Sequence, residues 1–337
     1  MSGRCGFLLG PILVLVAALA VVGGLVHHLL TAPGPLAESR TVIIERGDGP
    51  AAIARKLDGI GALADPRLFR LAARLSGADR ELRAGEFRIP AHASVTTLIK
   101  VLRRGEPVLR RVTIPEGLTS AQIVALLEAT EGLEGHVGPV PPEGTLLPET
   151  YYFTYGESRA ALIRRMAEAQ TTLIAELWPK RAADLPLHTS DEAIILASIV
   201  EKETARDEER PLIARVFLNR LARGMPLQSD PTVIYGVSGG TPLGRPIRKS
   251  ELAGDNPFNT YRLVGLPPAP ISNPGRASIA AVLHPADADF LYFVADGSGG
   301  HVFARTLAEH NRNVAAWRRL RLKRARPSSE SDAEPNR

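Results

Sequence analysis

The most informative stretch of the chain is residues 197–236, ASIVEKETARDEERPLIARVFLNRLARGMPLQSDPTVIYG. Its first part belongs to a predicted helix over 191–205, which Ser190 can cap. At 100° per residue, the apolar side chains of this helix form one stripe, with Glu203 in its middle and Glu201 on the polar side. Two carboxylates two residues apart are therefore expected in different surroundings.

A carboxylate that continues an apolar stripe has chemical consequences. Burial disfavours the charged form and raises the pKa of the acid. A carboxylic acid that stays protonated near neutral pH can protonate the leaving oxygen of a glycosidic bond. On geometry alone an alternative stays open: the helix reaches the domain edge, and Glu203 is exposed or paired with an arginine.

Outward from this stretch, the chain is predicted to be an α+β protein in five parts. In chain order they are a cytoplasmic stub and transmembrane anchor (1–30), a linker (31–40), a small α+β module (41–115), a larger mainly helical domain with a β-hairpin (116–320), and a basic, then disordered tail (321–337). In the small module, GDGPAAIARKL (47–57) and LRAGEFRIP (82–90) loosely resemble LysM-type peptidoglycan-binding modules. Any other small α+β domain is the alternative.

The individual elements follow from periodicity and from turn and capping signals. Strands are predicted at 41–45, 85–89, 109–114, 290–296 and 301–304, and helices at 51–57, 66–75, 95–104, 120–127 (capped by Thr119 or Ser120), 159–177, 208–223, 231–235, 277–283 and 306–321. The segment 236–275 is rich in proline and glycine and is predicted to be one long loop.

An uncharged apolar run, GFLLGPILVLVAALAVVGGLV (6–26), precedes the small module. About twenty such residues span a bilayer core as a helix, and the positive charge of Arg4 favours a cytoplasmic N-terminus. A cleavable signal peptide is the alternative. A lipoprotein anchor is disfavoured because Cys5 precedes the apolar run. We therefore expect a single-pass membrane protein in which everything after about residue 31 lies outside the cytoplasm.

Composition limits the class of protein. The 337 residues are 45% hydrophobic and 23% charged, which excludes a disordered or fibrous chain. The net charge of +5 is concentrated in six basic residues from Arg318 to Arg326, and subtracting them leaves −1 for the rest. A basic body that tracks phosphates is thus not expected, and nucleic acid is not a predicted partner.

Other chemistries lack their motifs. The single cysteine, Cys5, excludes a disulfide framework and a cysteine-based zinc cluster. No HExxH, GxSxG, Walker or GxGxxG motif occurs in the required context, so no metal site and no cofactor are predicted. His284 and His301 are interpreted as structural.

The motifs together resemble the YceG-like (MltG) family of endolytic murein transglycosylases, over nearly all of residues 6–320. The matching phrases are LLPETYYF (146–153), ASIVEKET (197–204), VFLNRLARGMPLQSDPTVIYG (216–236), NTYRLVGLPPAPISNPG (259–275) and HPADADFLYFVADGSGGHVFARTLAEHN (284–311). The resemblance implies a lytic transglycosylase, a lyase that cleaves MurNAc–GlcNAc β-1,4 bonds of nascent glycan strands, terminates their elongation and leaves 1,6-anhydro-MurNAc ends. It also implies a LysM-like domain and one catalytic glutamate in the EKE motif.

Glu203 is the predicted catalytic residue, and Glu201 is the second choice. The helical wheel favours Glu203, and the pair Glu203–Thr204 resembles the Glu–Ser pair around the catalytic acid of other lytic transglycosylases. The supporting residues predicted to bind substrate are Gln228, Asp230, Tyr235, Asn259, Tyr261 and Glu149.

Structural roles remain open for several of these supporting residues. Asp230 can cap the helix that begins at Pro231, and Tyr235 can pack as core. Glu149 stands where the family usually has Asp, and Phe258 replaces a common Tyr.

Two other functions compete with this prediction. A non-catalytic, membrane-anchored peptidoglycan-binding scaffold would rely on the LysM-like module alone, but the intact EKET and QSDPT segments argue against it. A hydrolase that uses water would leave reducing ends in place of anhydro ends. The resemblance further implies penicillin-binding proteins and the elongation machinery as partners.

Overall fold

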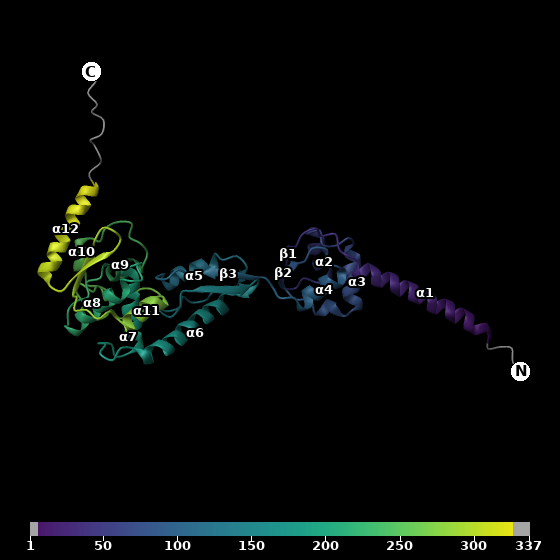
Figure 1. The fold of residues 1–337 in the computed structure, drawn as a ribbon, viewed down its shortest axis with the longest axis horizontal. Coiled ribbons are helices and arrows are strands. Elements are labelled where there is room, and N and C mark those ends of the chain that lie inside the picture. The colour runs from purple at the N-terminus through teal and green to yellow at the C-terminus, as the bar shows by residue number, and fades with distance from the viewer. Residues whose placement is uncertain (1–5, 326–337) are drawn as a thin grey trace, which may run out of the picture. The chain divides into compact units, whose positions relative to one another are not determined.

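The computed structural model describes residues 6–325, so Cys5, the predicted stub and the tail beyond residue 325 lie outside the described residues. The chain forms two compact units, which are labelled by element in Figure 1. Unit 1 comprises residues up to 111 with 131–134 and 152–158, and unit 2 comprises 112–130, 135–151 and the residues from 159 onward. The predicted mixture of helices and strands with one N-terminal apolar helix is confirmed.

In unit 1 the elements are α1 (Gly6–Thr31), β1 (Arg40–Ile44), α2 (Pro50–Gly59), α3 (Pro66–Leu75), the 3₁₀ turn η1 (Ala78–Arg80), β2 (Gly85–Ile89), α4 (Val95–Arg104), β4 (Leu133–Glu134) and β6 (Glu157–Ser158). The division between the units passes through β3 (Leu109–Thr113) and β5 (Thr150–Thr154), which form a two-stranded sheet. In unit 2 the elements are α5 (Ser120–Glu128), α6 (Arg159–Leu177), the 3₁₀ turn η2 (Trp178–Lys180), α7 (Ser190–Glu203), α8 (Arg210–Ala222), α9 (Asp230–Ser238), α10 (Lys249–Ala253), α11 (Arg276–Leu283), β7 (Tyr292–Ala295), β8 (His301–Ala304) and α12 (Leu307–Ala325).

Helix α1 is long and apolar enough to cross a membrane. The candidate span is Ile12–Thr31, with a mean hydropathy of 2.4, and its side chains are not covered by the rest of the protein. At its end, the carbonyl of Leu30 accepts a hydrogen bond from the Thr96 hydroxyl at the start of α4, at 3.3 Å. Length and composition thus make α1 a candidate membrane anchor, and its C-terminal end contacts α4 of the same unit.

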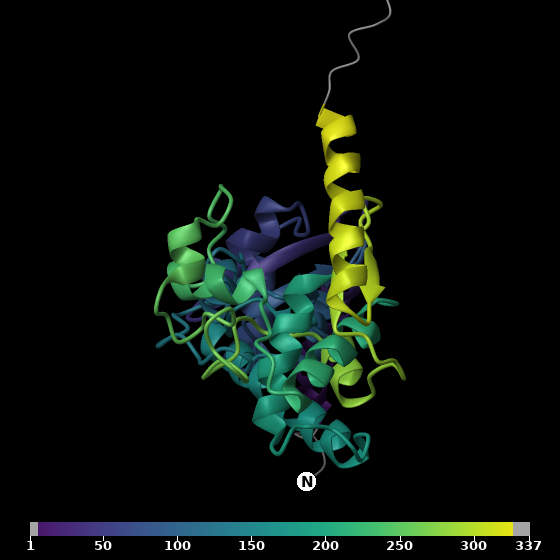
Figure 2. The ribbon, with the colours of Figure 1, turned by 90° about the vertical axis from the view of Figure 1, so that its left-hand side faces the viewer.

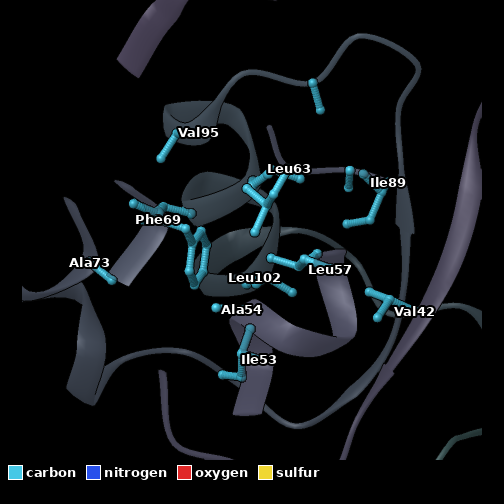
Figure 3. Packing of buried hydrophobic residues seen from close by; sticks show 14 of the residues in the cluster. Val42, Ile53, Ala54, Leu57, Leu63, Phe69, Ala73, Ile89, Val95 and Leu102 are labelled. Carbon is cyan, nitrogen blue, oxygen red and sulfur yellow. The ribbon is translucent and has the colours of Figure 1, made fainter. Parts of the chain in front are cut away.

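Unit 1 has a small apolar core between an antiparallel pair of strands and three helices. Strands β1 and β2 are antiparallel, with Val42 opposite Phe87. Figure 3 shows Phe69 of α3 and Leu102 of α4 among the side chains that fill the space between these elements. The segment before β1 is held on the same body, because Leu36 is buried and its carbonyl accepts from the amide of His92.

Unit 2 is built around a second core, in which α7, α8 and α11 pack against one another. Ala197, Ile199 and Val200 of α7 are fully buried there. The antiparallel hairpin β7–β8 packs against α12, and Figure 2 shows this helix in yellow beside the hairpin. The core places the C-terminal end of α7 among segments from far along the chain.

Three details differ from the sequence-based expectations. Thr189, and not Ser190, caps α7, with Glu192 closing a capping box. Asp230 is the first residue of α9 and Ser229 occupies the N-cap position, so the interpretation of Asp230 as the cap is wrong by one residue. The segment 236–275 contains the short helix α10, whose N-terminus Glu251 ties down by accepting from the Arg248 amide at 2.7 Å.

Asn273 joins several loops of unit 2. Its side chain is fully buried. The amide oxygen accepts from the Leu146 amide at 3.0 Å, and the amide nitrogen donates to the Ser120 hydroxyl at 3.0 Å and to the Leu118 carbonyl at 3.2 Å. One side chain therefore satisfies polar groups of two other segments, at 118–120 and at 146.

We expect Asn273→Ala to lower the free energy of unfolding by about 2–4 kcal/mol, because it leaves several buried polar groups without partners. Denaturant unfolding of the purified protein measures this. The matched control is Asn311→Ala on the exposed side of α12, which should change stability by less than about 0.5 kcal/mol. Equal stabilities for the two variants would contradict the role given to Asn273.

Candidate active site

Glu203 is the last residue of α7 and lies partly buried at the end of its apolar side. The helix stops there because Thr204 turns to an extended conformation, with φ −146° and ψ 142°. Burial is the main reason that the pKa of Glu203 is raised from 4.5 to about 7, and the charge of Asp230 adds to the effect. The wheel-based expectation of a carboxyl with a raised pKa is thus confirmed.

Ser229 is the direct partner of this carboxyl. Its hydroxyl donates to Oε1 of Glu203 at 2.5 Å, and the serine is almost fully buried. Although Ser229 stands at the N-cap of α9, its side chain makes no capping hydrogen bond. This bond favours the ionised form of Glu203 and opposes the effect of burial on its pKa.

The loop around Thr260 holds Ser229 in place. The amide of Ser229 donates to the Thr260 hydroxyl at 2.9 Å, and the amide of Gln228 donates to the Thr260 carbonyl at 3.0 Å. The hydroxyls of Thr232 and Thr260 lie 2.8 Å apart. Gln228 has a left-handed backbone, with φ 54°, which is strained for a non-glycine residue. Two segments about thirty residues apart are thereby fixed to each other beside Glu203.

Asp230 and Tyr261 form a second pair at the exposed side of these segments. The phenol of Tyr261 donates to Oδ1 of Asp230 at 2.6 Å. Burial, and then the hydrogen bond to Asp230, raise the pKa of Tyr261 well above its usual value, so this hydroxyl stays protonated. Asp230 itself is exposed.

Arg220 on α8 brings a buried positive charge to the same region. Its guanidinium donates to the carbonyls of Leu291 at 2.7 Å and Leu227 at 2.8 Å, and to the Gln228 amide oxygen at 3.4 Å. Its charge lowers the pKa of Glu203, against the larger effect of burial. The Arg220 guanidinium thus acts on the Glu203 carboxyl through its charge and not through a direct ion pair.

His301 lies on the other side, held by a buried carboxylate. Glu209 accepts from the His301 amide at 2.9 Å, lies 2.7 Å from His301 Nδ1, and accepts from the Thr204 hydroxyl at 3.2 Å. Burial opposes ionisation of Glu209, but these hydrogen bonds outweigh it and lower its pKa. The network ties strand β8 to the residue that follows Glu203, and a positively charged His301 would favour the ionised form of Glu203.

Glu201 has different surroundings. Its side chain is only 5% exposed and lies 3.5 Å from the guanidinium of Arg210, while its Oε2 accepts from the Gly275 amide at 3.0 Å. Glu201 lies away from the apolar stripe of α7, as the helical wheel predicts, but Arg210 and the start of α11 cover its side chain. Bonded in this way, Glu201 serves to join α7, α8 and the start of α11.

The other sequence-predicted residues fall into two groups. Gln228, Asp230 and Tyr261 lie with Glu203, as the contacts above describe. Asn259 is fully buried, and its amide nitrogen donates to the carbonyls of Leu252 at 3.0 Å and Gly254 at 2.9 Å. This residue shapes the loop that carries Thr260.

Tyr235 and Glu149 lie elsewhere in unit 2. The Tyr235 ring packs edge-on against Phe258 at 4.8 Å and belongs to the apolar core. Glu149 is exposed. Burial, and then the charge of Glu149, raise the pKa of Tyr151 to about 12, so Glu149 interacts with Tyr151.

Sequence reasoning missed the closest partner of Glu203. Ser229 lies between Gln228 and Asp230 in LQSDPT, and only these two neighbours were predicted to be site residues. Arg220 was also missed, and so was the electrostatic contact of His301 with the site. A sequence signal for Ser229 exists, because three consecutive polar residues (228–230) precede Pro231 and any of them can face inward from a loop.

Within residues 6–325, no group of three or more His, Cys, Asp or Glu side chains is arranged to hold a metal ion. The chemistry available at the site is that of one carboxyl with a pKa of about 7 and a hydroxyl donor at 2.5 Å. Such a group can give a proton to a leaving oxygen and then take one back at the same pH.

Comparison with known proteins gives a consistent picture. A profile described as the YceG-like family matches residues 42–316. A Bacillus subtilis protein named endolytic murein transglycosylase is 39% identical over 172 residues, which is 51% of this chain and 47% of the relative. A Streptococcus pneumoniae protein of the same name is 31% identical over 324 residues, covering 82% of this chain and 58% of the relative. The chain thus spans about half the length of these curated relatives.

Among solved structures, the crystal structure of a YceG-like protein from Listeria monocytogenes is similar to this chain. The TM-score is 0.51 and the sequences are 28% identical. The match covers 82% of this chain and 98% of the Listeria chain.

The raised pKa of Glu203 makes stability depend on pH. Between about pH 4.5 and 7 the folded state keeps a proton that the unfolded state has released, so stability falls as pH rises through this window. We expect Glu203→Gln to abolish that loss. The stability of the variant relative to the wild type should rise by about 2–3 kcal/mol from about pH 4 to about pH 8.

Denaturant unfolding at several pH values measures this difference. The control is Asn311→Ala, an exposed position without a titratable side chain, for which the difference should not vary with pH. If the difference in unfolding free energy between Glu203→Gln and the wild type does not change with pH, the Glu203 carboxyl ionises in the folded protein as it does in the unfolded chain.

Proposed function

Because the chain belongs to the YceG-like family, we propose that it is an endolytic murein transglycosylase. Its substrate is the glycan of peptidoglycan, in which it cleaves MurNAc–GlcNAc β-1,4 bonds of nascent strands. The cleavage leaves 1,6-anhydro-MurNAc ends and terminates strand elongation. The observation that carries this proposal is Glu203: a carboxyl whose pKa is raised to about 7, with a hydroxyl donor fixed beside it.

One carboxyl suffices for both halves of the reaction. Protonated Glu203 first gives its proton to the glycosidic oxygen, and the bond from C1 of MurNAc to that oxygen breaks, which releases a GlcNAc hydroxyl. The resulting carboxylate takes the proton of the C6 hydroxyl of MurNAc as O6 bonds to C1. The ring closes, Glu203 is again protonated, and no water is consumed. A hydrolase that inverts would need a second carboxylate to activate water.

The neighbours of Glu203 set the balance between its two forms. Burial and the charge of Asp230 favour the protonated acid that starts the reaction. The Ser229 hydroxyl and the charge of Arg220 favour the carboxylate that forms halfway. With a pKa near the working pH, Glu203 can act as the protonated acid in the first half of the reaction and as the carboxylate in the second half.

The supporting residues divide by exposure. Asp230 and Gln228 are exposed and lie next to Ser229 in sequence, so they are proposed to contact sugar hydroxyls or N-acetyl groups, together with Tyr261. Asn259 and Tyr235 are proposed to position the binding loops, since their side chains pack and bond within the protein. Glu149 is proposed as a more distant substrate contact.

The remaining parts of the proposal concern the cell envelope. Unit 1 is proposed to be a LysM-like module that binds glycan, and α1 a single-pass anchor in the bacterial inner membrane, with a cytoplasmic N-terminus and both units in the periplasm. Penicillin-binding proteins and the elongation machinery are the proposed partners. A non-catalytic scaffold is the less favoured function, because a binding module has no need of an acid with a pKa of about 7.

We expect Glu203→Gln to lower the rate of glycan cleavage by about 10²–10⁴-fold, since the variant cannot donate a proton. Digestion of purified sacculi with the full-length protein, read by mass spectrometry, measures the rate and the product ends. Glu201→Gln is the matched control two residues away and should keep measurable cleavage. Full activity in Glu203→Gln would refute the assignment, and reducing ends in place of anhydro ends would indicate a hydrolase.

The Ser229 hydroxyl should set the pH range of the reaction. Because it stabilises the ionised form, Ser229→Ala raises the pKa of Glu203, so the acid stays protonated to higher pH and the alkaline limb of kcat/KM moves upward. Ser238→Ala, whose hydroxyl bonds only within and just after α9, should leave the limb in place. A pH profile unchanged by Ser229→Ala would contradict the role of this bond.

A further inference from the structure

Helix α3 in unit 1 has two sharply different faces. Phe69, Ala72 and Ala73 are buried in the core, as Figure 3 shows for Phe69 and Ala73. The opposite face carries exposed side chains within an arc of about 140°. These side chains are Arg67, Arg70, Leu71, Arg74 and Leu75.

The exposed face borders a hollow of about 550 Å³. Arg67, Arg70 and Arg74 line it, with Leu71 and with Asp79 as its acidic group. Within the described residues no ion pair reaches any of the three arginines. Three neighbouring arginines thus line the same open space with one acidic residue among them, which favours an anionic ligand.

The leucines on this face indicate what kind of anion it is. Leu71 is 55% and Leu75 is 75% exposed, so two apolar side chains lie uncovered beside the arginines on this face. A face that combines arginines with exposed leucines suits a lipid surface, where the cations meet phosphate groups and the apolar side chains enter the boundary of the acyl region. An uncharged glycan would be better served by aromatic and amide side chains, and this face has neither.

The position of α3 in unit 1 supports the same conclusion. Helix α3 packs against α4, and α4 also contacts the end of α1, where Thr96 bonds to Leu30. Because α3 and the end of α1 both contact α4, their axes lie at most about two interhelix spacings apart, on the order of 20 Å. The face is therefore within reach of the head groups of a membrane that α1 crosses.

We propose that the arginine–leucine face of α3 docks on anionic phospholipid head groups of the membrane in which α1 is anchored. The phosphodiester oxygens pair with Arg67, Arg70 and Arg74, and Leu71 and Leu75 enter the lipid boundary. This docking fixes the orientation of unit 1 on the membrane. It rests on the proposed anchoring of the chain by α1.

The test uses the full-length protein in nanodiscs of neutral phosphatidylcholine, with or without about 30% phosphatidylglycerol. The native Cys5 is replaced by Ser, and an environment-sensitive dye is attached at Ser76→Cys, directly after α3. A second preparation carries the dye at Asp58→Cys, an exposed position on α2. We expect a blue shift at position 76 in the anionic discs only, reversed by high salt, and a smaller or no shift at position 58.

Charge variants then identify the contact. Each arginine near an anionic surface is worth about fivefold in the docking equilibrium, so Arg70→Gln/Arg74→Gln should reduce the ratio of docked to undocked protein about 25-fold. The matched control, Arg55→Gln/Arg88→Gln, removes the same charge from exposed positions on α2 and β2 and should change the ratio less than about twofold. Leu71→Ser/Leu75→Ser should diminish the blue shift.

Three results would overturn the docking. The first is an equal blue shift of the dye at position 76 in neutral and anionic discs, and the second is an equal loss of docked protein in the two arginine double variants. The third is a blue shift induced in neutral discs by soluble murein fragments, which would make the face a glycan site. Co-elution of the protein with the discs is a separate readout. Its failure would refute anchoring and docking together, whereas co-elution without a shift refutes docking alone.

Discussion

The hydrogen bond from Ser229 to Glu203 constrains the architecture of unit 2 around it. The bond forms at the C-terminal end of α7, where Thr204 turns to an extended backbone directly after Glu203. Ser229 must in turn be held from behind, and Thr260 does this through its hydroxyl and carbonyl. Asn259 fixes the loop that carries Thr260. Segments that are separated in sequence therefore converge on one carboxyl, and each is needed for the next.

The two glutamates of the EKE motif illustrate how a helix separates functions. Residues two apart on an α-helix point about 200° away from each other. Glu201 meets Arg210 and the Gly275 amide, which hold it as a bonded, covered group between helices. Burial raises the pKa of Glu203, and the hydrogen bond from the Ser229 hydroxyl offsets only part of that effect. Two glutamates within one helical turn thus have different surroundings, one bonded between helices and one with a raised pKa.

Much of the fold and part of the site could be predicted from the sequence. Strands at 85–89 and helices at 66–75, 95–104 and 159–177 were predicted with the bounds that the structure has, because periodicity, prolines and caps agree there. The stripe that carries Glu203 was also visible, since it depends only on residues of one helix. What could not be predicted depends on other segments: the cover over Glu201, the contact of Ser229 with Glu203, and the helix α10 inside a proline-rich loop.

The position of Ser229 also involves a local conflict that the sequence resolves. A serine at the N-cap ordinarily accepts a bond from the first turn of its helix, and losing that bond costs about 1 kcal/mol. In α9 the serine hydroxyl instead donates to Glu203. Asp230 in the first turn compensates through its negative charge at the positive end of the helix dipole. Pro231 has no amide hydrogen to satisfy, so one fewer donor is left without a partner. The sequence Ser-Asp-Pro therefore supplies a helix start that needs no serine cap, and the Ser229 hydroxyl remains available to donate to Glu203.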